Sequence, residues 1–226
     1  MADDQPYYGS WFLRIDRFAD THMVAAQGKD QSCALASIKM VHFKINKLKP
    51  GASALTTERR LEELYKKKAK ETAHDFDQAG SNPQVMVDVL NSMGTGMWTI
   101  EWPAIHAVGD RVAQLVGVDQ FGLGITGINA ATRKYPVILA CYWQPKGGHA
   151  IVVDTVTSVP AMGTYATICD PWDANIHFEK LEKGKPFTYT PKAAAGINIW
   201  GKTKADAAGI GGNGVIKAII HCKKAA

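Results

Sequence analysis

The sequence lacks the features that mark membrane, secreted and repeat proteins. None of its apolar runs approaches the roughly 18 residues that a membrane-spanning helix requires, so no membrane span is expected. The first residues are acidic where a secretory signal peptide would be basic, and no uninterrupted apolar stretch follows them. The four cysteines form no CxxC pair, which argues against a zinc ribbon or a small disulfide framework. Internal repeats and low-complexity linkers are also missing.

The residues that are present predict one folded domain over residues 1–226. With 46% hydrophobic and 21% charged residues, the chain can bury a sizeable core. The net charge is +5, and positive residues are concentrated in residues 57–72, which are typical of an exposed helix with Leu61, Leu64 and Tyr65 on its buried side. A solvated helical surface explains this charge better than a nucleic-acid or anionic-lipid site, because no groove-reading motif or interleaved aromatic residues accompany it. No nucleic-acid partner is therefore expected.

The order of apolar periodicities predicts an α+β fold. Helices dominate the first half, and the expected ones are 32–46, 57–72, 82–93 and 125–135. Strands dominate the second half, and the expected ones are 136–143, 148–157, 164–169, 175–179 and 215–221. Residues 95–124 are Gly-rich and expected to be irregular, and residues 183–214 to form a long surface excursion. We expect a helical lobe over about 1–124 and an antiparallel β lobe over about 125–226, with a cleft between them.

Cys33 differs from the other cysteines in its surroundings. It follows a polar stretch and stands at the predicted N-terminus of an amphipathic helix, where unpaired N–H groups and the helix dipole favour a thiolate. Gln27 precedes it by six residues, and its side-chain amide could join the Cys33 backbone N–H in binding an oxyanion. Cys141, Cys169 and Cys222 lie in strand-like apolar runs, where packing explains them.

His149 and Asp170 are the candidate partners of Cys33. His149 follows a Gly-Gly turn and opens an apolar strand, a place from which an imidazole can reach a cleft as general base and acid. Asp170 ends the next strand, before Pro171, and could hold the imidazole by one ring nitrogen. Trp172 could shield this pair from water. Asp173 is the alternative orienting acid if Asp170 is structural.

Other polar residues make weaker candidates. Asp154 lies about 17 Å from His149 along a strand, too far for direct contact. His42 is interpreted as a packed residue behind Cys33. The remaining histidines show no partner pattern: His22, His74, His106, His177 and His221. A metal site of Cys33, His149 and Asp170 would lack a fourth ligand of suitable spacing, so neither a metal nor another cofactor is expected.

Taken together, these residues resemble the motifs of the papain-like cysteine peptidases. That pattern has a Gln six residues before the nucleophilic Cys, a Gly-His-Ala motif, and a polar third residue followed closely by Trp. Here these are Gln27, Cys33, Gly148-His149-Ala150, and Asp170 with Trp172. The Asp-Pro pair is more similar to bacteriocin-processing (double-glycine) peptidases and to papain-like effector peptidases of plant-associated bacteria.

The resemblance covers about 27–43 and 134–173, and the sequence departs from it in several ways. The third residue is Asp170 where papain has Asn, and residues 1–26 and 183–226 match nothing in the pattern. Papain's Cys is followed by Trp, whereas Ala34 follows Cys33 here. The resemblance implies a papain-like fold and a cysteine peptidase that hydrolyses peptide bonds through an acyl-enzyme. Cys33 would be the nucleophile, His149 the acid and base, Asp170 the orienting residue and Gln27 part of the oxyanion hole.

The resemblance also implies partners, and alternatives stay open. The substrate would be a protein or peptide, no cofactor would be needed, and the chain would be a bacterial effector or toxin delivered into another cell, or a peptidase held inactive by an inhibitor or immunity protein. Since a signal peptide, a disulfide framework and a membrane segment are all lacking, the expected location is the cytoplasm, or export by a dedicated secretion system. The same triad would also serve an amidase or deamidase, or a peptidoglycan endopeptidase. A catalytically idle papain-like module that binds a peptide is the third interpretation.

Overall fold

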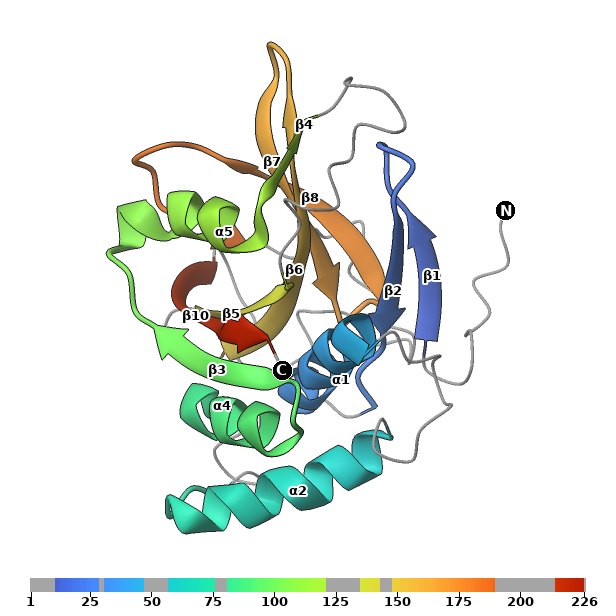
Figure 1. Ribbon diagram of the computed structural model, residues 1–226, viewed down its shortest axis with the longest axis vertical. Coiled ribbons are helices and arrows are strands. Elements are labelled where there is room, and N and C mark those ends of the chain that lie inside the picture. The colour runs from blue at the N-terminus through green and yellow to red at the C-terminus, as the bar shows by residue number, and fades with distance from the viewer. Residues whose placement is uncertain are drawn as a thin grey trace.

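The computed structural model describes residues 11–28, 31–46, 57–75, 81–120, 135–142, 148–189 and 214–225. In these residues a large, mainly antiparallel sheet carries helices on both faces, which makes the fold α+β (Figure 1). No helix in this part of the chain is both long and apolar enough to cross a membrane.

The main sheet joins strands from distant parts of the sequence. Within the described residues its order is β3-β10-β5-β6-β7-β8, and every neighbouring pair in that path is antiparallel. The strands are β3 (Gly96–Glu101), β10 (Gly214–Ala225), β5 (Val137–Tyr142), β6 (Gly148–Val159), β7 (Gly163–Asp170) and β8 (Asn175–Leu181). Two short strands lie off this path: β4 (Val118–Gln120), parallel to β6, and β9 (Thr188–Tyr189), antiparallel to β10. A separate hairpin consists of β1 (Trp11–Ile15) and β2 (Thr21–Ala25).

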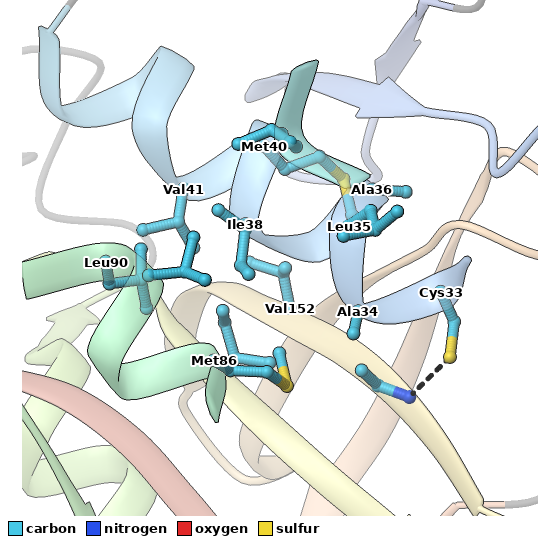
Figure 2. Close-up of a cluster of buried hydrophobic side chains, with 14 of the residues drawn as sticks. Cys33, Ala34, Leu35, Ala36, Ile38, Met40, Val41, Met86, Leu90 and Val152 are labelled. Atoms are coloured by element: carbon cyan, nitrogen blue, oxygen red, sulfur yellow. Dashed lines mark hydrogen bonds between the residues drawn. The ribbon is translucent and has the colours of Figure 1, made fainter. Parts of the chain in front are cut away.

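Both faces of β6 are buried, which explains its nearly continuous apolar sequence. Alternate residues contribute to two cores. Val152 belongs to the core under α1 (Cys33–Asn46), and Val153 to the core under α5 (Val108–Val116). Figure 2 shows the first of these cores, where side chains of α1 and α4 (Pro83–Ser92) lie around Val152. Each large apolar side chain buried in this way contributes about 1.5–3 kcal/mol.

The charged helix α2 (Glu58–Glu71) forms an outer layer on the α1 and α4 side. Thr57 caps it by accepting the N–H of Arg60, and its apolar side buries Leu61 and Tyr65 as the sequence predicts. The Tyr65 hydroxyl donates to the carbonyl of Asn82, the residue that caps α4, at 3.0 Å. This contact ties the outer helix to the inner one.

The prediction that residues 95–124 are irregular is wrong for the part that the structure describes. Residues 96–120 contain β3, a 3-10 helix (η2, Ile105–Ala107), α5 and β4. The glycines are compatible with these elements: Gly96 begins β3, Gly109 lies inside α5, and Gly117, with φ of 83°, closes α5. Val108, Val112 and Val116 had the four-residue spacing of a buried helical stripe, and all three are buried.

Strands also occur where the sequence indicated helices or surface. The hairpin of β1 and β2 occupies residues 11–25, and β3 joins the main sheet, so the first half of the chain supplies strands as well as helices. The expected helix 125–135 lies almost entirely outside the described residues, as does most of the expected excursion 183–214. The described start of that excursion is not wholly on the surface, because Phe187 and Tyr189 are buried.

A buried charge network anchors the β1–β2 hairpin; we call Asp16, His22, Lys44 and Asp154 the hairpin network. His22 donates from Nδ1 to Asp154 at 2.5 Å and from Nε2 to Asp16 at 3.2 Å. Lys44 of α1 forms an ion pair with Asp154. The expectation that His22 has no partner is thus wrong. Since β2 leads directly to Gln27, the network also fixes the strand that presents this residue.

Candidate active site

Cys33 begins α1, where the sequence placed it. Its sulfur accepts the backbone N–H of Ala34 and, at 3.5 Å, the N–H of Ala150 in β6. Figure 2 shows the thiol at the first turn of α1, directed toward Ala150. Cys33 is 7% exposed, so these backbone donors act on it in surroundings that hold little water.

His149 lies between Cys33 and Asp170. It is the second residue of β6, is 5% exposed, and donates from Nε2 to Oδ1 of Asp170 at 2.6 Å. Its imidazole also lies close enough to Cys33 for each group to shift the pKa of the other. Because Nε2 faces the carboxylate, Nδ1 is the ring nitrogen left to meet the thiol. The structure therefore brings the three predicted residues together from α1, β6 and β7.

Asp170 is fully buried at the end of β7 and is held on both oxygens. Oδ1 accepts the N–H of Trp172 at 2.8 Å as well as the His149 bond, and Oδ2 accepts the hydroxyl of Tyr189 at 2.5 Å. Trp172 is itself buried beside this carboxylate. Asp173, the alternative orienting acid, instead accepts a hydrogen bond from His177 at 2.9 Å.

Opposing effects set the charges of the pair. For Cys33 the largest single effect is burial, which raises the pKa. His149 and the two backbone N–H groups act in the opposite direction, and together they lower the pKa of the thiol below its usual value. For His149 burial lowers the pKa. The charge and hydrogen bond of Asp170 outweigh burial, Cys33 adds a smaller effect of the same sign, and the pKa rises to about 9. Near neutral pH the two groups together favour a thiolate and an imidazolium.

Gln27 is buried on a loop that is fixed at two points. Its backbone N–H donates to the carbonyl of Pro171 at 2.8 Å, which attaches it to the turn after Asp170. The N–H of the next residue, Gly28, donates to both carboxylate oxygens of Glu58 at 2.9 and 3.0 Å. A Cβ on Gly28 would meet the same carboxylate at 3.0 Å, so a residue without a side chain suits this contact. These two contacts fix the backbone of Gln27 beside the turn that follows Asp170.

Tyr189 is the residue of this site that the sequence did not indicate. It lies in the stretch that was expected to form a surface excursion, yet its ring is buried and its hydroxyl reaches Asp170. A signal was present: Phe187 and Tyr189 alternate with polar residues, as in a short half-buried strand.

Two groups of metal-type ligands occur among the described residues, each with its atoms within 4.8 Å of one another. They are His22–Asp154–Cys169 and Asp170–Asp173–His177. In the first group the Lys44 ammonium already balances Asp154, and in the second Asp170 binds His149 and Tyr189. Cys33 belongs to neither group, and both are better explained as hydrogen-bonded charge clusters than as cation sites.

A thiolate beside an oriented imidazolium can attack a carbonyl carbon and then protonate the leaving group. Acyl transfer is therefore the chemistry that this arrangement can perform. No protein-family model matches the chain, and no curated protein matches it either.

Proposed function

We propose that the protein is a papain-like cysteine peptidase that hydrolyses peptide bonds through an acyl-enzyme. One observation carries the proposal: the Cys33 thiol stands at a helix N-terminus beside the His149 imidazole, which is hydrogen-bonded to the buried Asp170 at 2.6 Å, and the charge of His149 lowers the pKa of the thiol. Lone cysteines and histidines are common in proteins, but a thiol, an imidazole and a carboxylate in this order form the arrangement that activates a nucleophile.

In the proposed reaction the Cys33 thiolate forms a bond to the carbonyl carbon of the substrate. The carbonyl electrons move to oxygen, and the N–H of Cys33 and the side-chain amide of Gln27 stabilise the oxyanion. His149 gives its Nδ1 proton to the leaving amine as the C–N bond breaks. Water then attacks the thioester, His149 removes its proton, and the acid product leaves with the Cys33 thiolate and the imidazolium restored. Asp170 stays ionised and keeps the imidazole oriented.

Reactivity at low pH tests the nucleophile without a substrate. Cys222 is more exposed than Cys33 and is the matched comparison within the same chain. If the thiolate of Cys33 is preformed, iodoacetamide at about pH 5.5 labels Cys33 first, as peptide mapping by mass spectrometry would show. Labelling of Cys222 ahead of Cys33 would mean that exposure alone governs reactivity, and the idle-module interpretation would then replace the peptidase.

Product analysis separates peptidase from amidase. The purified protein is incubated with a heat-denatured bacterial protein mixture, and new N-termini and free ammonia are both measured. The proposal expects new N-termini with the wild type and with Cys222→Ala, and none with Cys33→Ala. Release of ammonia without new N-termini would show an amidase that uses the same triad.

A further inference from the structure

We propose that Tyr189 is a positioning residue of this site, whose hydroxyl fixes Oδ2 of Asp170 so that Oδ1 stays directed at His149. The inference rests on the proposed function, since it assigns a part in the same triad. Tyr189 touches neither Cys33 nor a reacting atom in this scheme, and it acts through Asp170.

The geometry of the Asp170 carboxylate creates the need for such a residue. The terminal torsion of an aspartate is broad, so a carboxylate held at one oxygen can rotate about its bond to Cβ. Oδ1 is held by His149 and Trp172, on one side of the group. The Tyr189 hydroxyl at 2.5 Å holds the opposite oxygen and stops this rotation. A buried ionised carboxylate also needs several donors to remain charged.

The sheet, and not a loose loop, places this hydroxyl. Tyr189 is the last residue of β9, which pairs with β10 through Gly214, and the N–H of Ile216 donates to the Phe187 carbonyl at 3.2 Å. The ring is fully buried and meets the ring of His177 edge-on at a centroid distance of 5.7 Å. The position of the hydroxyl is therefore as fixed as that of a core side chain.

The charges around Asp170 strengthen the argument. The titratable groups that lie near Asp170 or Tyr189 are His149, Asp173, His177, Cys141 and Glu179. Asp173 lies within 4.8 Å of Asp170, so the Asp170 carboxylate has a like charge beside it and depends on its hydrogen-bond donors. Burial and the nearby carboxylates raise the pKa of Tyr189 well above its ordinary value, so its hydroxyl keeps its proton and donates throughout the working pH range.

The test is the pH dependence of kcat/KM for peptide cleavage in Tyr189→Phe, which removes the hydroxyl and keeps the ring. Without this donor the Asp170 carboxylate can rotate away from His149, and the charge and hydrogen bond that raise the pKa of His149 weaken. The basic limb near pH 9 should therefore move down by about one pH unit, the equivalent of one hydrogen bond to a charged group. Tyr165→Phe is the control, because the Tyr165 hydroxyl donates to the Met162 carbonyl on the surface.

Superimposable basic limbs for the wild type and Tyr189→Phe, whatever their melting temperatures, would overturn the assignment. A wild type that cleaves no peptide would instead overturn the proposed function itself, and the assignment with it. The two failures are thus told apart by the wild-type profile alone.

Discussion

Replacing His22 by leucine tests whether the hairpin network stabilises the fold through charge. His22 is buried and donates to two carboxylates, so the variant removes both bonds and keeps a side chain of similar bulk. Removing one partner from a buried ion pair costs about 3–5 kcal/mol. The cost here should lie near the lower end, because Asp154 keeps Lys44 and Asp16 keeps the N–H groups of Phe18 and Asp20 at 2.8 and 2.9 Å.

The pH dependence gives this prediction a sign. Burial lowers the pKa of His22, but the hydrogen bonds of Asp16 and Cys169 outweigh it, so the folded pKa lies above the ordinary 6.5. Such a histidine stabilises the fold fully below its unfolded pKa, and the stabilisation is lost as the pH rises through the folded pKa. The free energy of unfolding of the wild type should therefore fall as the pH rises above about 6.5. His149 contributes a fall of the same sign, which the variant keeps.

Urea unfolding followed by tryptophan fluorescence, at about pH 6 and about pH 9, measures the effect. His22→Leu should lose about 3 kcal/mol at the lower pH, a large part of the 5–15 kcal/mol of a typical domain, and clearly less at the higher pH. His106→Leu, which changes an exposed histidine in η2, should lose little at either pH. Equal losses for His22→Leu at both pH values would show that packing, and not charge, explains the contribution of His22.

Three further predictions concern the proposed reaction. Cys33→Ala should abolish peptide cleavage. Asp170→Asn should lower kcat about 10- to 100-fold, which is less than the loss in His149→Ala, because an amide oxygen still accepts the hydrogen bond from Nε2 of His149. Equal losses for these two variants in single-turnover assays would mean that the charge of Asp170 dominates. The kcat/KM profile should be bell-shaped, with an acid limb below the usual pKa of a thiol and a basic limb near pH 9, where His149 loses its proton; a profile that rises steadily through pH 9 would contradict the ion pair. Gly28→Ala should lower kcat more than it raises KM, because the new Cβ would meet the Glu58 carboxylate at 3.0 Å and weaken the contact that fixes the loop of Gln27; an unchanged kcat would show that this contact does not position Gln27.

Local signals predicted most of the helices and the strands of the second half. Asn82 and Pro83 mark the start of α4, and the apolar run after Gly148 coincides with β6. Each of these signals lies within about ten residues of the element it predicts, and short-range backbone preferences are what a sequence shows most directly.

Pairing between distant strands could not be predicted in the same way. Trp98 of β3 is the partner of Cys222 of β10, and nothing local in either segment specifies the other. For the site, the sequence indicated which helix or strand carries each of Cys33, His149 and Asp170. It did not indicate that the three side chains lie close together, because that depends on how α1 crosses the sheet. Tyr189 remained hidden for the same reason, because its role depends on the pairing of β9 with β10.

The place of β10 has a consequence for the timing of synthesis. This strand is the last one in the described chain, yet it lies inside the sheet between β3 and β5 and also holds β9. A chain made from its N-terminus exposes β3 and β5 before their common neighbour exists, and both edges stay open to wrong pairing until it arrives. Cys33 and its partners are translated well before that moment, so a nascent chain would carry the reactive groups without the scaffold that aligns them. Any catalysis by the proposed triad would then begin only after β10 has been translated and has joined the sheet.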